Sequence, residues 1–192
     1  MPRVKGERRL EILKALAQML EQPKWGKITT AALADKLDVS EAALYRHFAS
    51  KAQMYEGLIE FIESSVFSVA NKIAQDEPDG AKQAAKLVEM LLSFAEKNPG
   101  MVRVMTGDAL VGEHERLQAR MNQFYDRFEA TLKQALRAAG ADGGQKPSDA
   151  DVTSHAGLLT RYMIGCLHQY AKSGFTRKPT DSYAAQRRFL AA

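Results

Sequence analysis

Residues 28–51, ITTAALADKLDVSEAALYRHFASK, decide the fold, because their apolar positions predict two short helices joined by a tight turn. Six apolar side chains have the spacing that would lock one helix across the other: Leu33, Ala34, Leu37, Val39, Leu44 and Phe48. An ordinary helical hairpin is the plainer alternative. The polar outer face of the second helix favours a helix-turn-helix, the motif that places a helix in the major groove of DNA.

The predicted second helix presents short and polar side chains outward, which suits a close approach to base edges. Ten residues form the predicted DNA contact set: Thr29, Thr30, Ser40, Glu41, Ala42, Ala43, Tyr45, Arg46, His47 and Lys51. We expect the two threonines to meet phosphates from a helix start and residues 40–43 to approach the bases. We expect Tyr45, His47 and Lys51 to clamp phosphates.

The net charge of +4 lies entirely in this part of the chain. Residues 1–51 hold ten Lys or Arg against six Asp or Glu, whereas residues 52–192 hold seventeen of each. Cations that neutralise phosphates release condensed counterions, so a basic head on a neutral body suits DNA binding. Four cations precede or open the first helix, where they either form an arm along the DNA or are simply solvated: Arg3, Lys5, Arg8 and Arg9.

Composition places the chain among ordinary globular proteins. With 192 residues, of which 45% are hydrophobic, it can bury a substantial core. Cys166 is the only cysteine, so we expect no internal disulfide and a packing role in a reducing compartment. No signal peptide is recognisable and no apolar run approaches the length of about 18 residues that a membrane span needs. We therefore expect a cytoplasmic protein.

Helical periodicity continues along the rest of the chain. It predicts helices over about residues 7–21, 50–74, 81–97, 101–110, 113–139 and 149–173, with a last short helix within 179–192. No strand pattern interrupts them, so the predicted class is all-α. We divide the chain into a three-helix DNA-binding head, residues 1–51, and a helical body for dimerisation and partner binding, residues 52–192.

The predicted helix over residues 149–173 has apolar residues at close to heptad spacing, which is typical of helices that associate. A reader of palindromic DNA needs two heads at a fixed separation of about 34 Å. We therefore expect a homodimer in which helices 113–139 and 149–173 pair with their symmetry mates. Leu159 and Met163 are predicted at the centre of that interface.

Residues 28–51 resemble the DNA-binding head of TetR-family regulators, whose pattern includes Thr at the start of the second helix, Val-Ser at the turn and Leu-Tyr-x-His-Phe-x-Ser-Lys. The resemblance extends through the body to one branch of that family, the nucleoid occlusion factors. Four body segments carry it: GLIEFIE, LLSFAEKNPGMVRVMTGDAL, ERLQARMNQFYDRFEATLKQALR and FTRKPTD. In all, it covers about residues 10–181.

The resemblance implies a nine-helix dimer that binds palindromic double-stranded DNA sites on the chromosome, in association with the nucleoid. When bound to DNA, such a protein engages the cell-division protein FtsZ and blocks septum assembly. The resemblance also points to a groove for the FtsZ C-terminal tail, with these residues: Phe61, Met90, Ser93, Lys97 and Asn98. An apolar and acidic peptide needs an apolar anchor and a cation at the rim, which Phe61 and Lys97 would supply. The alternative is that Phe61 belongs to the core and Lys97 only caps a helix end.

The chain departs from the pattern of this branch at three positions. Asp38 stands where the turn usually has Gly, at a position that favours left-handed backbone, and Asp tolerates that conformation better than most residues. Ala49 replaces Pro, and Lys97 replaces Arg. We expect the fold to survive all three changes.

Two other classes of function compete with this interpretation. Catalysis finds little support, because the four histidines and the lone cysteine show no metal-ligand or dyad spacing. The adjacent Glu113, His114 and Glu115 are expected to be solvated, so the sequence predicts no enzyme, metal or cofactor. A TetR-type repressor released by a small apolar ligand is the stronger competitor. Five side chains would line its cavity, although such residues more often form simple core: Phe94, Met105, Phe124, Phe128 and Met163.

Overall fold

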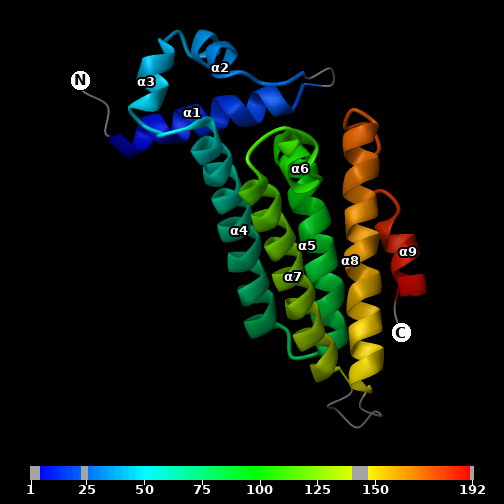
Figure 1. The fold of residues 1–192 in the computed structure, drawn as a ribbon. Helices are drawn as coiled ribbons and strands as arrows, with labels where there is room; N and C mark the ends of the chain where they lie inside the picture. The colour runs from blue at the N-terminus through cyan, green and yellow to red at the C-terminus, as the bar shows by residue number, and fades with distance from the viewer. Residues whose placement is uncertain (1–4, 23–25, 140–146, 191–192) are drawn as a thin grey trace.

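The computed structural model describes residues 5–22, 26–139 and 147–190, and every regular element within them is helical (Figure 1). The head holds α1 (Lys5–Leu20), α2 (Thr30–Lys36) and α3 (Glu41–Tyr45). The body holds α4 (Lys51–Asp76), α5 (Gly80–Lys97), α6 (Pro99–Met105), the 3-10 turn η1 (Asp108–Leu110), α7 (Glu115–Ala138), α8 (Asp149–Lys172) and α9 (Tyr183–Leu190). The predicted all-α class is confirmed. None of the described helices combines the length and the apolar character that crossing a membrane requires.

The head lies across one end of the body. In Figure 1, α4 leaves the head at the top and runs down beside α7 and α5, with α8 next to them and α9 on the outer side of α8. Because α7 packs against α4, α5 and α8, it lies at the centre of the body. The predicted boundary at residue 51 falls in the first turn of α4, a helix of 26 residues that joins the two parts without a break.

Three hydroxyl side chains cap the N-termini of α2, α3 and α4. Thr29 Oγ1 accepts a hydrogen bond from the Ala32 N–H at 3.1 Å, and Ser50 Oγ accepts one from the Gln53 N–H at 3.2 Å. Ser40 caps α3 in the same way. Each cap satisfies an amide that the helix leaves without an internal partner. Local sequence thus fixes where α2, α3 and α4 begin.

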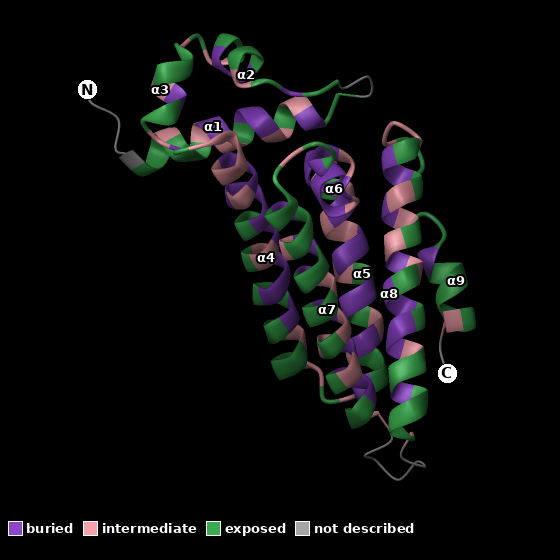
Figure 2. Cartoon of the chain, in the orientation of Figure 1, coloured by how far each residue is buried: buried purple, intermediate pink, exposed green. Residues whose placement is uncertain are grey.

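Apolar stripes that face one another hold the body together. Six residues of α7 at spacings of three and four form one such buried stripe: Leu117, Met121, Phe124, Phe128, Leu132 and Leu136. Phe124 packs against Phe67 of α4 with a ring-centroid separation of 5.4 Å. Buried residues follow the inner sides of the long helices, whereas their outer sides are exposed (Figure 2). This apolar burial is the main source of stability in a body whose helices would be marginal alone.

A buried arginine fastens the head to the body. Arg103 of α6 donates hydrogen bonds from Nε to the Leu20 carbonyl at 2.8 Å and from Nη2 to the Gln22 carbonyl at 3.2 Å. Its guanidinium lies 4.6 Å from the ring centroid of Phe175, which follows α8. Burial lowers the pKa of this guanidinium, and the carboxylate of Asp108 opposes that shift. The open carbonyls at the end of α1 are therefore capped by a cation from the body.

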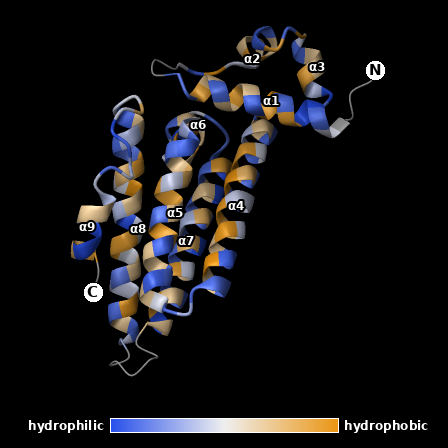
Figure 3. Cartoon of the chain, turned by 180° about the vertical axis from the view of Figure 1, so that it is seen from behind, coloured by the Kyte–Doolittle hydropathy of each residue, from blue (hydrophilic) through white to orange (hydrophobic). Residues whose placement is uncertain are grey.

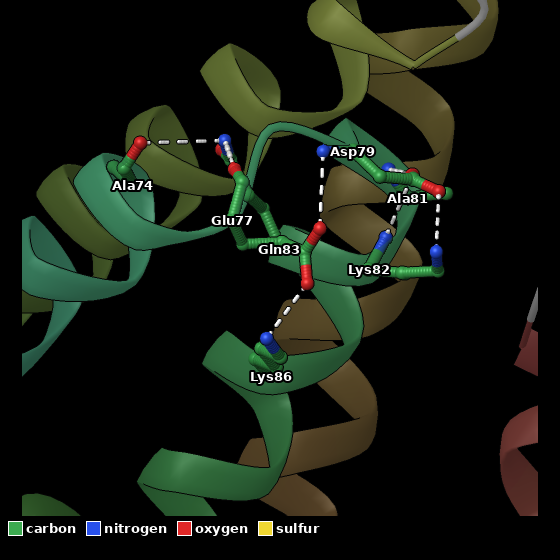
Figure 4. A network of polar contacts seen from close by, with 7 residues as sticks. All are labelled: Ala74, Glu77, Asp79, Ala81, Lys82, Gln83 and Lys86. Atoms are coloured by element: carbon green, nitrogen blue, oxygen red, sulfur yellow. Dashed lines mark hydrogen bonds and ion pairs between the residues drawn. The ribbon is translucent and has the colours of Figure 1, made fainter.

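The turn between α4 and α5 is closed by side chains as well as by backbone (Figure 4). Glu77 pairs with Lys86 at 2.7 Å and accepts a hydrogen bond from the Asp79 N–H at 3.2 Å. Asp79 caps α5 by accepting from the N–H groups of Ala81 and Lys82 at 2.9 and 3.1 Å. The Lys86 hydrogen bond lowers the pKa of Glu77, and the Lys82 N–H lowers that of Asp79. These contacts fix the far ends of α4 and α5 to each other.

Candidate DNA interface and partner groove

Most of the predicted DNA contact set lies together on the segment that contains α3. Ser40, Glu41, Ala42, Tyr45 and Arg46 are exposed, while Ala43 and His47 are half-buried. Leu44 and Phe48 are buried beneath them and lock the segment onto the rest of the head. The structure thus gathers seven of the ten predicted residues within positions 40–47. Their contact with DNA stays a prediction.

The turn before α3 has the backbone that the sequence predicts. Asp38 has a φ of 53°, in the left-handed region that Gly usually occupies. A hydrogen bond that the sequence did not reveal joins the two helices: Thr30 Oγ1 donates to Glu41 Oε2 at 2.5 Å. Thr30 and Glu41 therefore reach the predicted DNA surface as a bonded pair, beside the exposed cap Thr29.

Lys51 lies where the head meets the body, and its ammonium already has a partner. It forms an ion pair with Glu113, in the segment between η1 and α7, and lies 5.7 Å from the ring centroid of Tyr55. The side chains of Lys51 and Glu113 are only 20% and 11% exposed, so the expectation that Glu113 is solvated is wrong. Burial, together with the Glu113 carboxylate, raises the pKa of Tyr55, which keeps its hydroxyl neutral.

One cation of the predicted basic arm is a structural clamp. Arg9 Nη1 donates to the His47 carbonyl at 2.6 Å, and its guanidinium lies 4.2 Å from the ring centroid of Phe48. This contact joins α1 to the segment after α3 across 38 positions of sequence, so no local pattern could reveal it. Arg3 and the side chain of Lys5 lie outside what the structure describes.

The predicted partner residues lie along α4 and α5. Phe61 is 44% exposed, which excludes the alternative that it is a core residue, and its ring centroid lies 6.3 Å from that of Phe94. Lys97 is exposed in the last turn of α5, and Met90 and Ser93 are half-buried on the same helix. The two helices therefore offer an accessible aromatic pair with a cation near one end.

Asn98 closes one end of this surface, and a second exposed apolar residue, Val69, lies farther along α4. Asn98 Nδ2 donates to the Phe94 carbonyl at 2.8 Å, which closes the end of α5. Val69, which is 45% exposed, lies two turns beyond Phe61 on α4. Apolar residues alternate with polar ones down the length of α4 in Figure 3. The sequence did not single out Val69, because a single valine in a helix rich in apolar residues does not show whether it faces the core or the solvent.

The prediction that Leu159 and Met163 form the centre of a dimer interface is wrong. Leu159 is 5% exposed and Met163 is 0% exposed within one protomer, so neither can reach a second copy. Their stripe serves the protomer's own core, because α8 packs on α5, α6 and α7. The free side of α8 begins one position away. There Leu158 is 49% exposed, and a Cβ on Gly165 would meet no atom within 4 Å.

The side chains that the alternative ligand cavity would need were expected to form simple core, and the structure agrees for all but Phe94. Four of these five residues belong to the core, with exposures of at most 2%: Met105, Phe124, Phe128 and Met163. A hollow of about 450 Å³ lies elsewhere, between α5, α7, α8 and α9, and is lined by Val152, Leu159 and Tyr183 among others. Across residues 5–22, 26–139 and 147–190, no group of three His, Cys, Asp or Glu side chains is placed to hold a metal ion.

Two family profiles match the chain. The profile described as "Bacterial regulatory proteins, tetR family" covers residues 12–58, which include α2 and α3. The profile described as "Tetracyclin repressor-like, C-terminal domain", an SlmA-like profile, covers residues 81–192 and so includes α6 to α9. Together they cover most of the head and most of the body.

Relatives match over nearly the whole length. The nucleoid occlusion factor SlmA of Alteromonas mediterranea is 49% identical over 187 residues, which are 97% of this chain and 95% of that protein. The protein of the same name from Marinomonas sp. (strain MWYL1) is 48% identical over 191 residues, or 100% and 96% of the two chains. Among solved structures, the TetR family transcriptional regulator PfmR from Thermus thermophilus has a TM-score of 0.76 at 18% identity, over 94% of this chain and 96% of that one.

Proposed function

This chain belongs to the TetR family and, within it, to the nucleoid occlusion factors named SlmA, and from that premise we propose that it binds chromosomal DNA and blocks septum formation over the nucleoid. One observation carries the proposal. The alignments at 48–49% overall identity span both head and body, and an SlmA-like profile matches residues 81–192, whereas the solved TetR-type regulator shares the same fold at only 18% identity. A body that matches this profile supports a task beyond holding two heads together.

DNA binding is the first half of the proposal. Glu41 and Ala42 lie exposed in the first turn of α3, where small or polar side chains can approach base edges in the major groove. Tyr45 and Arg46 follow on the exposed side and suit phosphate contacts. The surplus of four positive charges in residues 1–51 favours the approach to DNA.

A homodimer is the form in which we expect the protein to read palindromic sites. The face that supports it is the free side of α8, which carries Leu158 and the open backbone at Gly165. A small residue there lets two helices approach closely, and Leu158 supplies apolar area for burial. Symmetry then sets the two heads about one helical turn of DNA apart, roughly 34 Å.

Binding of the FtsZ C-terminal tail is the second half. The exposed Phe61, beside the half-buried Phe94, forms an apolar anchor, and Lys97 supplies a cation for an acidic residue of the tail. Met90 and Ser93 would floor the groove, and Asn98 holds the end of α5 beside it. The protein would thus act through binding alone, as a regulator and not as an enzyme, in the cytoplasm at the nucleoid.

Chromatin immunoprecipitation tests the proposal. A nucleoid occlusion factor should occupy many scattered sites that are depleted near the replication terminus, whereas a metabolite-controlled repressor should occupy one or a few operators near its own gene. Variant Arg46→Ala should lose most of the sites, and variant Phe61→Ala should keep them while division over the nucleoid resumes. A single operator beside the gene would refute the occlusion function and leave a DNA-binding regulator.

A further inference from the structure

We propose that Glu113 competes with DNA phosphate for the ammonium of Lys51, so that a carboxylate of the body sets how tightly the head holds DNA. The inference rests on the proposed DNA binding and deepens it, because it gives a positioning role to a residue outside the helix-turn-helix.

The competing pair is assembled from two distant segments. Lys51 opens α4 directly after the Ser50 cap, and Glu113 comes 62 positions later, just before α7. The Glu113 N–H donates to the Leu110 carbonyl at 3.0 Å, which holds the backbone of that segment in place. Tyr55, buried below the ammonium, restricts where the Lys51 side chain can lie. The pair is therefore positioned by the fold and is not a chance meeting of two surface side chains.

The charge balance at Lys51 determines how this ion pair affects the affinity for DNA. A free lysine that meets a phosphate releases about one condensed counterion, which contributes about 0.9 to the salt slope of binding. A lysine that a carboxylate already neutralises contributes less, and a phosphate that takes the ammonium leaves Glu113 without its partner in a site that is only 11% exposed. Glu113 therefore weakens DNA binding at each head.

The structure also offers Glu113 a second partner once the first is taken. A hollow of about 240 Å³ between head and body is lined by Lys27, Tyr55, Asp108 and Glu113, among others. The Lys27 ammonium lies 4.0 Å from the place where a Cβ on Gly112 would stand, next to Glu113 in the chain. When phosphate holds Lys51, the Glu113 carboxylate has room to turn toward Lys27. By linkage, DNA binding then changes the position of the Glu113 side chain.

Variant Glu113→Gln tests the inference, because glutamine keeps the shape and can still accept a hydrogen bond from Lys51. The matched control is Glu63→Gln, which removes the same charge from a different ion pair, that between Glu63 of α4 and Arg120 of α7 at 2.6 Å. Glu63 lies about 18 Å along α4 from Lys51, beyond the Debye length of about 10 Å in 0.1 M salt. DNA affinity is measured from 50 to 300 mM KCl on a mixed-sequence duplex and on a duplex that the wild-type protein selects from random DNA.

We expect Glu113→Gln to bind both duplexes about two- to thirtyfold more tightly per dimer at low salt, with a steeper salt slope, while Glu63→Gln stays near wild type. In a Lys51→Ala background the gain should vanish. If Glu113→Gln gained equally in that background, the carboxylate would act by general repulsion and the inference would be refuted. A wild-type protein that binds DNA normally while Glu113→Gln matches the Glu63→Gln control would overturn the inference alone. A wild-type protein that did not bind the mixed-sequence duplex and selected no duplex from random DNA would overturn the proposed function, and the inference with it.

Discussion

The exposed sides of α3 and α8 both lie away from the protomer's core, yet sequence reasoning located the first and misplaced the second. Only five residues of α3 follow the Ser40 cap. Because Leu44 and the following Phe48 are buried, they determine which residues of this short helix face the solvent. In α8 there are 24 residues, and apolar side chains stand on both sides of the helix, as the neighbours Leu158 and Leu159 show. A short capped helix reveals its outer side, whereas a long helix with two apolar sides does not.

Substitutions at two adjacent positions of α8 have the largest expected effects, and they test which side of α8 faces the core and which side is free. Leu159→Glu puts a charge at a core position, and we expect loss of folding, because an unpaired buried charge costs on the order of several kcal/mol. Leu158→Glu puts the same charge on the free side, where we expect a folded monomer in place of the dimer. Circular dichroism and sedimentation distinguish the two results. A Leu158→Glu variant that stays dimeric would remove this side of α8 from the interface.

The proposed partner groove on α4 and α5 comes next, because it extends the comparison to a second surface of the body. Phe61→Ala should weaken binding of the FtsZ C-terminal tail by about thirtyfold, the loss of a typical aromatic anchor, and Lys97→Ala should weaken it less. Since Phe61 is exposed, the melting temperature and the DNA affinity should stay near wild type. Val111→Ala, which removes another exposed apolar side chain, is the control. Normal tail binding by both groove variants would show that the tail binds elsewhere.

Within the head, Arg46 and Lys51 form a matched pair of cations. Arg46 is exposed, so Arg46→Ala should lower the salt slope by about 0.9 per head. Lys51 is paired with Glu113, so Lys51→Ala should lower the slope by less. Titration of one duplex over a range of KCl concentrations measures both slopes. Equal reductions would mean that the ion pair opens freely when DNA binds.

The smallest expected effect lies in the turn between α4 and α5. The pKa of Glu77 is lowered, first by its hydrogen bond from Lys86, so the folded state favours the carboxylate. Its contribution to stability is therefore complete above the unfolded-state pKa of about 4.3 and disappears as the pH falls through the folded-state value. Urea unfolding of wild type and Glu77→Gln should differ slightly at pH 7 and coincide near pH 3. A difference that persisted at pH 3 would show that packing, and not charge, is responsible.

Sequence reasoning succeeded where the signal is local. The left-handed Asp38 and the helix periods depend on neighbouring residues, so the fold class and the exposed face of α3 followed from them. The exposure of Phe61 agreed with a prediction that rested on family resemblance, because periodicity alone left core and groove open.

The remaining features depend on contacts between distant segments. No pattern in the sequence links Lys51 to Glu113 across 62 positions. Glu113 was expected to be solvated and Lys51 to clamp a phosphate, whereas the structure pairs the two side chains with each other. Nor does a pattern link Arg103 to the carbonyl of Leu20, which lies 83 positions away. On α8, the heptad spacing correctly predicted a helix that packs, but it packs against the protomer's own core. The same spacing occurs in helices that pack within a protomer and in helices that pack across a dimer interface, so it does not distinguish the two.

The buried Arg103 fixes the head on the body and, in the proposed dimer, also the distance between the two heads. Because its guanidinium holds the end of α1 and stacks on Phe175, the head cannot tilt against the body without removing a buried cation from its hydrogen bonds. The gap between two heads is then a property of the bodies, and the DNA must match it. One inserted base pair moves a half-site by about 3.4 Å. We therefore expect selection from random DNA to return a single spacing between half-sites.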